Sequence, residues 1–377
     1  MITSLIKSGF GHSVRFIAMV ENLRKYSDEK ISYLAPECMQ KFIESNVANY
    51  NCKPYDLYYY LALMEEKAVK PKKNMKKGDQ KLIQQLQKSS VLIDDFFLYA
   101  RLRKLFSNKT ITCGLYHGDI SISKNDSKEV VFFKNGVCKR ANQHDVFFHI
   151  NLEQPKNKPD IKCMYIPIPI ITRQVSMSKQ SVNRLLGLSP DEKFILVHAG
   201  AAVSTNVYKK LYPFYDAINR LKSEHRIVIA GSIDNHEFPF HSGIIKAPIF
   251  YNGIDLVNAS ELVISKPGMG ILQDCIAAKK KLLFVPADSP ERDVKIDLLN
   301  KLLSNNLPII NKISASNLGA CISECFSMED IYVQSFAKVP TNGADVLAKD
   351  INILKDTKKS DLAEAVSLIR KERPFIV

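Results

Sequence analysis

The chain has 377 residues, which is long for a single hydrophobic core, and 46% of them are hydrophobic, so we expect two globular domains. No apolar run approaches the roughly 18 uncharged residues of a membrane-spanning helix, and we expect no signal peptide before the first strand. These features favour a cytoplasmic protein, and the net charge of +14 indicates an anionic partner or a charged surface.

The first half alternates short apolar strands with helical segments. The predicted strands are Ile2–Ile6, Ile31–Leu34, Val91–Ile93 and Ile111–Leu115. Residues 16–23 have apolar side chains at helical spacing, which predicts an amphipathic helix after the first strand. Asn135-Gly136 within Val130–Cys138 predicts a β-hairpin with a type I′ turn. The proline-rich segment Tyr165–Ile171 is expected to connect the two halves.

The second half is more regular. Its predicted strands are Phe194–Val197, Ile227–Ala230, Leu262–Ile264 and Leu282–Val285. They alternate with helical segments, which is typical of a parallel, doubly wound α/β sheet. A final helix is predicted over Asp361–Arg373.

Two glycine-rich turns each follow a predicted strand and open a helix. The first is Gly9-Phe10-Gly11, with the ionisable His12 at the helix start. The second comprises Lys266, Pro267, Gly268, Met269, Gly270 and Ile271. Glycines let backbone N–H groups approach a ligand closely, and a helix N-terminus attracts phosphate. Asp274 follows about one turn inside the second helix, where a carboxylate can accept hydrogen bonds from sugar hydroxyls. The second turn therefore indicates a nucleotide site.

The two motifs together, Gly-x-Gly-His-x-x-Arg and Lys-Pro-Gly-x-Gly-x-x-x-Asp, resemble the GT-B nucleotide-sugar glycosyltransferases. The nearest likenesses are the transferase-like domain of L-arabinokinases and the N-acetylglucosaminyltransferase that forms lipid II. Three further segments are similar to the family and occur in its order: 184–193, 254–260 and 342–348. The resemblance covers most of the chain. It implies an α/β protein with two Rossmann-like domains facing across a cleft: an acceptor-side domain (1–170), a donor-binding domain (171–355) and a helix returning to the first domain (356–377).

The resemblance implies a metal-independent transferase that needs no cofactor beyond the nucleotide-sugar donor. An acceptor hydroxyl attacks the anomeric carbon, His12 is the candidate base, and His117 is a candidate acceptor contact. Donor contacts are expected from Gly9, Gly11, Arg173, Gly200, Ala201, Lys266, Pro267, Gly268, Met269, Gly270, Ile271, Asp274 and Asp293. Arg173 would lie against the donor diphosphate, because a guanidinium fork suits phosphate oxygens.

Each of these assignments has a structural alternative. His12 could be a polar residue at a helix start without chemistry, Arg173 an exposed linker charge, and His117 a loop residue. Asp94-Asp95 could supply a second acid–base group, although a helix cap is favoured. The sequence also departs from the family: Ile271 stands for a Thr and Asp274 for a Glu, and glycine is scarce around Ala201. A nucleotide-sugar hydrolase or epimerase, and a non-catalytic binding protein, therefore remain alternatives.

Part of the positive charge is concentrated between Lys67 and Lys81. The segment is either a solvated loop or a contact with anionic lipid at the inner face of a membrane, which would suit a lipid-linked acceptor. Nucleic acid is not expected, since no aromatic residues interleave with these lysines. The eight cysteines show no zinc-site spacing, and reduced thiols agree with a cytosolic protein.

Overall fold

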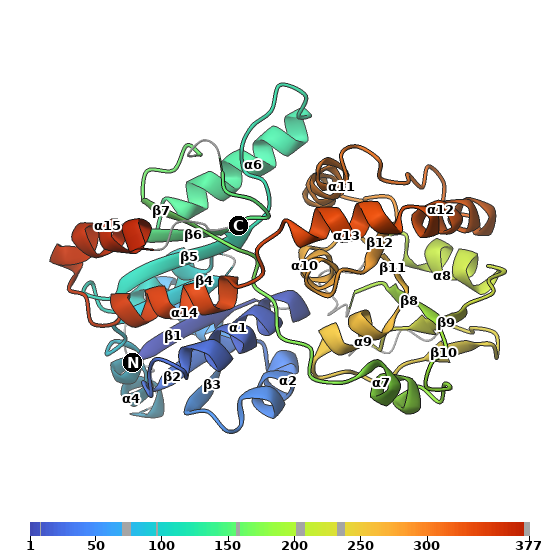
Figure 1. Ribbon diagram of the computed structural model, residues 1–377. Coiled ribbons are helices and arrows are strands. Elements are labelled where there is room, and N and C mark those ends of the chain that lie inside the picture. Colours follow the sequence, from blue (N-terminus) through green and yellow to red (C-terminus); the bar gives the residue numbers. More distant parts are fainter. Residues whose placement is uncertain are drawn as a thin grey trace. The chain divides into compact units, whose positions relative to one another are not determined.

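The computed structural model describes residues 1–7, 9–69, 77–95, 97–155, 159–200, 208–231 and 238–372. The chain forms two compact units (Figure 1). Unit 1 comprises Met1–Asp126, Val131–Ile171 and Pro340–Val377, and unit 2 comprises Ser127–Val130 and Thr172–Val339. Each unit is an α/β structure built on its own parallel sheet, which confirms the predicted fold class.

Unit 1 contains a seven-stranded sheet in the order β3-β2-β1-β4-β5-β6-β7, and all neighbouring strands are parallel. The strands are β1 (Ile2–Ile6), β2 (Ile31–Ala35), β3 (Cys52–Asp56), β4 (Val91–Asp95), β5 (Ile111–His117), β6 (Val146–Ile150) and β7 (Met164–Ile168). Every residue of β1, β2, β4 and β6 is buried, because helices cover both faces. The strand order reverses between β1 and β4, which makes their carboxyl ends the topological switch point.

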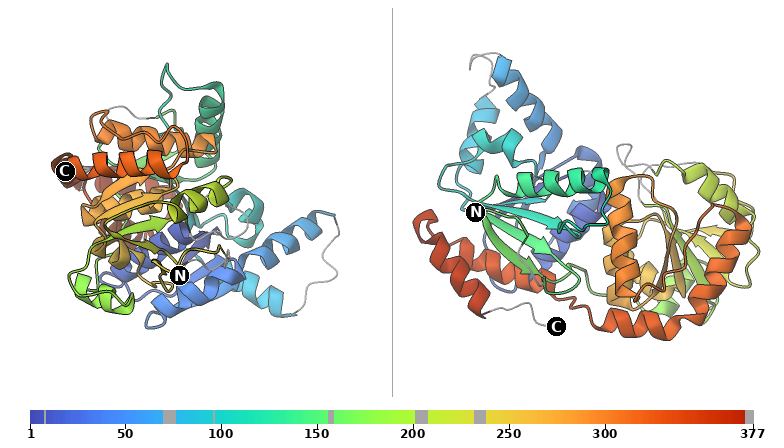
Figure 2. Two further views of the ribbon diagram at one scale, coloured as in Figure 1. Left: turned by 90° about the vertical axis from the view of Figure 1, so that its right-hand side faces the viewer. Right: turned by 90° about the horizontal axis from the view of Figure 1, so that it is seen from above.

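The helices of unit 1 lie on both sides of this sheet (Figure 2). One face carries α2 (Glu37–Val47), α1 (Phe10–Leu23), α14 (Gly343–Leu354) and α15 (Leu362–Glu372), each packed on the next, with η2 (Lys359–Asp361) before α15. The other face carries α3 (Leu57–Val69), α4 (Lys77–Leu86), α5 (Tyr99–Leu102), η1 (Arg103–Leu105) and α6 (Lys128–Ala141). Two apolar clusters form the core on this second side, one around Leu5 and Leu92 and one around Phe147.

Unit 2 contains a five-stranded parallel sheet in the order β10-β9-β8-β11-β12. The strands are β8 (Phe194–His198), β9 (Arg226–Ile229), β10 (Ile244–Lys246), β11 (Leu262–Ser265) and β12 (Lys281–Phe284). The helices are α7 (Lys179–Leu185), α8 (Leu211–Asn219), α9 (Gly253–Ala259), α10 (Met269–Ala278), α11 (Pro290–Leu302), α12 (Ala315–Ser327) and α13 (Glu329–Ala337). Here the order reverses between β8 and β11, so the switch point lies where these two strands end.

The structure corrects the predicted hairpin at Val130–Cys138, because these residues lie in helix α6. Val130, Lys134, Val137 and Ala141 are buried, and their spacing is that of one helical face. Phe132 is exposed on the opposite side of the helix. The helical burial pattern therefore outweighs the local turn preference of Asn135-Gly136.

Two segments near the domain boundaries differ from the expectation. The proline-rich segment is not the connection itself: it forms β7, which lies at the edge of the sheet, where the missing N–H of Pro167 is tolerated. The second domain was expected to continue to residue 355, whereas unit 1 takes up the chain again at Pro340. Helix α14 belongs to unit 1 because it packs along α1, where the Tyr26 hydroxyl donates a 2.5 Å hydrogen bond to Asp345.

Candidate active site

The first glycine turn lies at the switch point of unit 1, between β1 and α1. Gly9 is the N-cap of α1 and has φ = 130°, a conformation that L side chains rarely adopt. A Cβ on Gly9 would lie 3.5 Å from the His12 ring, and a Cβ on Gly11 would lie 3.8 Å from Arg15 Nη1. A Cβ at either position would thus make only ordinary contacts, and it is the positive φ that favours glycine at position 9.

His12, Arg15 and Asp95 form a close polar cluster at this point. Arg15 Nε lies 3.0 Å from Asp95 Oδ2 and Arg15 Nη2 lies 2.9 Å from Oδ1, so the guanidinium grips the carboxylate with two hydrogen bonds. His12 Nδ1 lies 3.0 Å from Asp95 Oδ1 and 2.8 Å from Arg15 Nη2. Burial raises the pKa of the Asp95 carboxyl, but the charges of Arg15 and His12 outweigh it and hold this pKa below its ordinary value.

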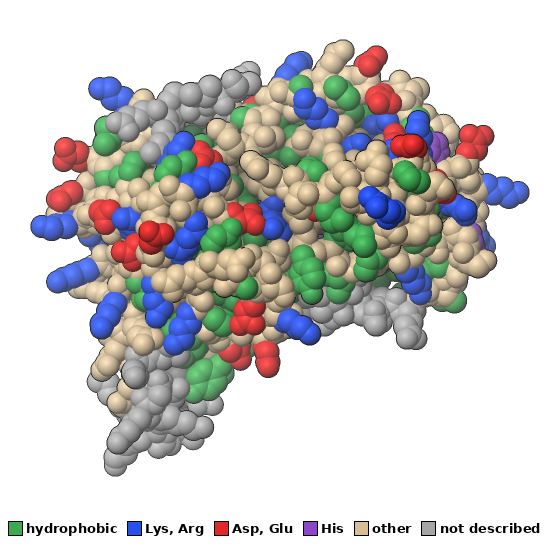
Figure 3. Space-filling view, turned by 60° about the horizontal axis from the view of Figure 1, so that its bottom comes forward, with side chains coloured by type: hydrophobic (Ala, Val, Ile, Leu, Met, Phe, Trp, Pro, Cys, Tyr) green, Lys and Arg blue, Asp and Glu red, His purple; other side chains and the backbone are tan. Residues whose placement is uncertain are grey.

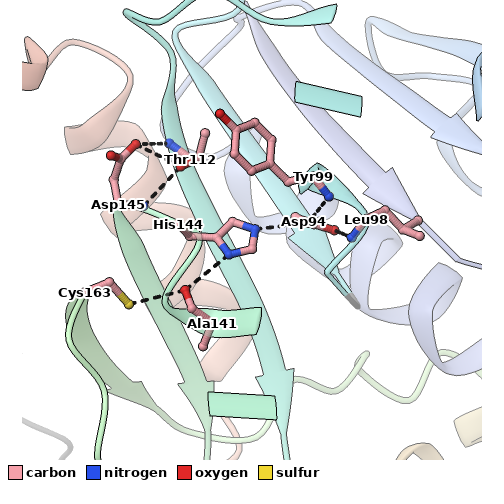
Figure 4. Close-up of polar contacts among 8 residues, drawn as sticks. All are labelled: Asp94, Leu98, Tyr99, Thr112, Ala141, His144, Asp145 and Cys163. Atoms are coloured by element: carbon pink, nitrogen blue, oxygen red, sulfur yellow. Dashed lines mark hydrogen bonds and ion pairs between the residues drawn. The ribbon is translucent and has the colours of Figure 1, made fainter. Parts of the chain in front are cut away.

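The neighbouring carboxylates Asp94 and Asp95 point to opposite faces of β4, because side chains alternate along a strand. Figure 4 shows Asp94 on the side of α5, where it accepts hydrogen bonds from the N–H groups of Leu98 (2.7 Å) and Tyr99 (2.5 Å). His144 Nε2 lies 3.0 Å from the same carboxylate, and both side chains are fully buried. Asp94 therefore caps a helix, as favoured from the sequence, and only Asp95 meets His12.

The cluster can organise His12 for proton transfer. A guanidinium only donates hydrogen bonds and a carboxylate only accepts them. A bare Nδ1 can accept from Arg15 Nη2, and a protonated Nδ1 can instead donate to Asp95. In the second tautomer the other ring nitrogen, Nε2, keeps a lone pair that can accept a proton. The imidazole is partly exposed, whereas Arg15 and Asp95 are buried behind it.

His117 ends β5, two residues beyond the residue that pairs with Asp95, so it lies at the same edge of the sheet. Its ring stacks on Tyr116 with a centroid separation of 5.3 Å. The role of His117 as an acceptor contact stays a prediction.

The second glycine turn lies at the switch point of unit 2, between β11 and α10. Gly268 is the N-cap of α10 and no side chain caps the helix, so the first backbone N–H groups have no side-chain acceptor. Pro267, Met269 and Ile271 are buried. These three residues, and Gly270 between the last two, can therefore contact a ligand chiefly through their backbone.

Lys266 runs alongside Gly200, which follows β8. Gly200 has φ = 85°, and a Cβ there would lie 2.3 Å from Lys266 Cε. Burial, together with the nearby charges of Arg292 and Lys295, lowers the pKa of Lys266 to about 8. Burial and the charge of Lys266 lower the pKa of His198 to about 4, so this imidazole is neutral. Within the described part of the chain, His198 Nδ1 has no hydrogen-bond partner. Ala201 lies outside the described residues.

Asp274 lies on α10, half-buried, one turn beyond the glycine turn. Burial raises its pKa to about 7, and the charge of Arg173 opposes this shift. Arg173 is also tethered, since its Nη1 donates a 2.9 Å hydrogen bond to the carbonyl of Tyr251. The structure thus brings the predicted residues Arg173 and Asp274 into one electrostatic neighbourhood.

The loop after β12 and the start of α11 contribute further charges. Arg292 bonds to Asp288, and its guanidinium lies 5.7 Å from the centre of the Tyr208 ring. Burial and the neighbouring carboxylate of Asp297 raise the pKa of Asp293, and Lys210 opposes this. Asp293 is thus near Lys210, and no described contact links it to Asp274.

Sequence reasoning missed several residues that the structure adds to these sites. Arg15 was part of the first motif but had no assigned role, and Asp95 could not be told from Asp94. Arg292 and Lys295 influence Lys266 from helix α11. Their i, i+4 pairing with Asp288 and Glu291 was a visible signal, but it is also typical of an ordinary surface helix.

Known structures share this fold over nearly the whole chain. The chain is similar to a UDP-glucosyltransferase from Polygonum tinctorium that glucosylates indoxyl, with a TM-score of 0.63, 11% identity, and 95% of this chain and 98% of that chain covered. It is also similar to UGT2 of Phytolacca americana, solved with UDP-2-fluoroglucose and pterostilbene, with a TM-score of 0.61, 14% identity, and coverage of 97% and 99%. For CalG4, the calicheamicin glycosyltransferase, the TM-score is 0.56, the identity 11%, and the coverage 99% of both chains.

No protein-family model matches this sequence, and no curated protein matches it. Among the described residues, no helix is both long and apolar enough to cross a membrane. In the same part of the chain, no group of three or more His, Cys, Asp or Glu side chains could hold a metal ion. With two parallel Rossmann-like sheets and these structural neighbours, the chain has the GT-B fold of the nucleotide-sugar glycosyltransferases.

Proposed function

We propose that this protein is a glycosyltransferase that moves a sugar from a nucleotide-sugar donor to an acceptor hydroxyl. The observation that carries the proposal is the donor-type site at the switch point of unit 2. There the start of α10, with Lys266 beside Gly200, follows the carboxyl end of β11, and Asp274 lies one turn further along the helix. This is the edge where ligands bind to doubly wound sheets. The structural neighbours support it, because two of them are described with UDP-sugar chemistry.

In this proposal the donor diphosphate binds the N–H groups at the start of α10 and the ammonium of Lys266. Asp274 accepts hydrogen bonds from ribose hydroxyls, and Arg173 adds positive charge beside it. These donors and cations stabilise the departing diphosphate, so the step that we propose is independent of a metal ion. Ala201 and Asp293 remain candidate donor contacts.

The proposed chemical step is a displacement at the anomeric carbon. The acceptor oxygen forms a bond to this carbon, and its proton passes to His12 Nε2. The bond from the anomeric carbon to the diphosphate oxygen breaks, and its electron pair leaves with the nucleoside diphosphate. Asp95 holds the His12 ring through Nδ1 and stabilises the imidazolium that forms. His117 is the proposed acceptor contact on the same edge of the sheet.

We also propose that the acceptor is lipid-linked and that unit 1 attaches peripherally to an anionic membrane. The support is the basic segment Lys67–Lys81, most of whose side chains lie outside those described. It continues from helix α3, on whose first turn Tyr58 and Tyr59 are exposed. Aromatic rings with a polar tip suit a lipid–water interface, and lysines suit anionic headgroups.

The test of the donor site is thermal unfolding with UDP and UDP-sugars in the wild type and in Gly268→Val. A ligand at 100 times its Kd adds about 2.7 kcal/mol to the free energy of unfolding. A Cβ at Gly268 would meet only ordinary contacts, Ile271 Cγ2 at 3.6 Å and the Lys266 carbonyl at 3.7 Å, so the variant should fold. We expect its valine to block the approach of the diphosphate and abolish the shift.

Gly253→Ala, which places a Cβ in open space at the start of α9, is the control and should keep the shift. Equal shifts in the wild type and Gly268→Val would refute the donor site. Consumption of UDP-sugar without an acceptor would instead favour the hydrolase, and binding without any consumption would favour a non-catalytic protein.

A further inference from the structure

Residues 172–178 form the strap through which the chain enters unit 2, and the strap is tied down along its length. Asp255, which is 1% exposed, accepts hydrogen bonds from Ser176 N (2.6 Å), Ser176 Oγ (2.6 Å) and Met177 N (3.1 Å). Asn252, at the N-cap of α9, donates from Nδ2 to the carbonyl of Gln174 (2.9 Å) and to Ser176 Oγ (3.1 Å). Asn252 and Asp255, three residues apart at the start of α9, thus hold the strap at Gln174, Ser176 and Met177.

Arg173 belongs to this strap, one residue before the first clamped position. Its Nη1 donates 2.9 Å to the carbonyl of Tyr251, the residue next to Asn252. The same start of α9 therefore fixes both the backbone after Arg173 and the guanidinium itself. Arg173 is therefore a half-buried residue whose side chain is tethered.

The fixed guanidinium acts on Asp274, the carboxylate of α10. The charge of Arg173 lowers the pKa of Asp274, against the larger upward shift from burial. Coulomb interactions weaken with distance and with mobility of the partner, so the effect depends on holding Arg173 in place. Helices α9 and α10 also pack on each other, which makes the clamp and its target one structural block.

We propose that Asn252 and Asp255 are positioning residues that clamp the strap 172–178 and thereby hold the Arg173 guanidinium beside Asp274. The clamp thus keeps Arg173, at the entry to unit 2, in place as a cation of the donor site. The consequence for a nucleotide rests on the proposed function, whereas the clamp itself is a property of the unliganded protein.

The test compares Asn252→Ala combined with Ser176→Ala with the wild type. This pair removes three clamp hydrogen bonds and spares the buried Asp255, so the backbone N–H groups keep their acceptor and the fold is maintained. The carboxyl carbon of Asp274 is titrated by NMR with ¹³C-labelled aspartate and assigned with Asp274→Asn. The clamp is then loosened, although the two backbone bonds to Asp255 and the Arg173 bond to Tyr251 remain. Arg173 should compensate Asp274 less, and the pKa should rise above the value of about 7 by up to about one unit.

Ser178→Ala is the matched control. It removes the N-cap hydrogen bond of α7 from the same strap, at Ser181 N, without touching the clamp, and should leave the titration of Asp274 unchanged. Arg173→Met removes the guanidinium and so gives the largest pKa shift of Asp274 that its loss can cause. In that background the clamp substitutions should cause no further shift, because their effect passes through Arg173. The same titration in the clamp variant and the wild type, or an equal shift in Ser178→Ala, would overturn the proposal.

UDP affinity distinguishes the clamp from the proposed function. We expect UDP to bind the clamp variant about three- to tenfold more weakly than the wild type, since a charge-assisted contact becomes mobile. If the wild type binds no UDP, the proposed function fails, and the Asp274 titration still decides the clamp. A raised pKa with unchanged UDP affinity would support the clamp and remove Arg173 from the donor contacts.

Discussion

Buried ionisable groups are stabilised in different ways at the two switch points. At the end of β4 the carboxylate of Asp95 is buried but gripped by Arg15 and His12, so the group stays ionised. At the start of α10, burial dominates: Asp274, Lys266 and His198 have pKa values of about 7, 8 and 4, each shifted toward the neutral form. The charges at the switch point of unit 1 compensate one another, and those at the switch point of unit 2 do so far less.

This difference suggests different tasks for the two units. A compensated cluster is organised before any ligand arrives, which suits a base whose orientation must be fixed. Lys266 and His198, which burial pushes toward neutrality, gain most from a ligand of negative charge, which suits a site for a diphosphate. The predictions below test whether the two sites separate in this way.

The largest effect is expected from His12→Ala, which should lower kcat for transfer about 10²- to 10⁴-fold. The substitution removes the proton acceptor and leaves unit 2 unchanged, so the affinity for UDP should stay within about twofold. Steady-state kinetics and calorimetric titration of UDP measure the two quantities. Full activity of His12→Ala would exclude this residue as the base.

Asp95→Asn tests whether His12 depends on Asp95 when it acts as the base. An amide in place of the carboxylate cannot stabilise an imidazolium and can present an N–H to Nδ1, which favours the wrong tautomer. We expect a loss of kcat approaching that of His12→Ala, and little further loss in the double variant because the residues act as one unit. Asp94→Asn is not a suitable control, since Asp94 caps α5 and pairs with the buried His144.

The next largest effect should come from Gly200→Ala in unit 2. A methyl group there would collide with the Lys266 side chain, which must then leave its position. We expect UDP to bind about 10- to 100-fold more weakly, because a charge-assisted hydrogen bond is worth about 1.5–3 kcal/mol. Gly187→Ala is the matched control: Gly187 also has a positive φ, 71°, but nothing lies within 4 Å of its added Cβ. Gly187→Ala should have the same kind of backbone strain as Gly200→Ala but no collision with a side chain. Equal UDP affinities in the two variants would rule out displacement of Lys266 as the cause.

A smaller effect, which grows as the pH rises from about 4 to 7, is expected from Asp274→Asn. The pKa of Asp274 is raised in the folded protein from its ordinary value of 3.8 to about 7. Between these values the unfolded chain has lost the proton and the folded chain keeps it, so the stability contributed by Asp274 is present below pH 4 and is lost as the pH rises through 7. Asparagine is neutral throughout and avoids this loss.

The variant should therefore unfold at nearly the wild-type temperature at pH 4.5, and at a higher temperature at pH 8. Because Asp274 is only half-buried, we expect a gain of about 1–2 kcal/mol, or about 2–8 °C in Tm. Thermal unfolding followed by circular dichroism at the two pH values measures it. A constant Tm difference across this range would show that Asp274 is not held neutral by burial.

Much of this fold could be predicted because its central strands are continuous apolar runs. The strands β1, β4, β8 and β11 that flank the switch points were all identified in the sequence. Three of the four edge strands carry no such signal: β3 contains Lys53 and Pro54, β7 contains Pro167, and β10 has three residues. The fourth, β12, is apolar and was predicted. β6 is different, since Val-Phe-Phe-His-Ile is an apolar run that the sequence analysis passed over.

The parts of the sites that glycine patterns mark could be predicted from the sequence. The parts that depend on side-chain direction or on contacts between distant residues could not. Gly9 and Gly268 follow strands and precede helices, so the two turns could be located from the sequence. The choice between Asp94 and Asp95 depends on how far β4 continues and which face each side chain takes. The clamp on Arg173 joins residues more than 70 positions apart, a relation that no local pattern contains.

The smallest effect on the two sites themselves is expected from Lys72, Lys73, Lys76 and Lys77 changed to Gln. On the face in Figure 3, Lys and Arg side chains are interspersed with Asp and Glu, so the described surface shown there offers no single basic patch. Binding to anionic vesicles should depend on the basic segment and weaken in the variant, while UDP affinity is unchanged.

Binding should also fall with salt, because the Debye length shrinks from about 10 Å at 0.1 M to about 3 Å at 1 M. Neutral vesicles are the control and should not bind, since exposed tyrosines alone give little insertion. Equal sedimentation of wild type and variant with anionic vesicles would identify Lys67–Lys81 as a solvated segment without a membrane role.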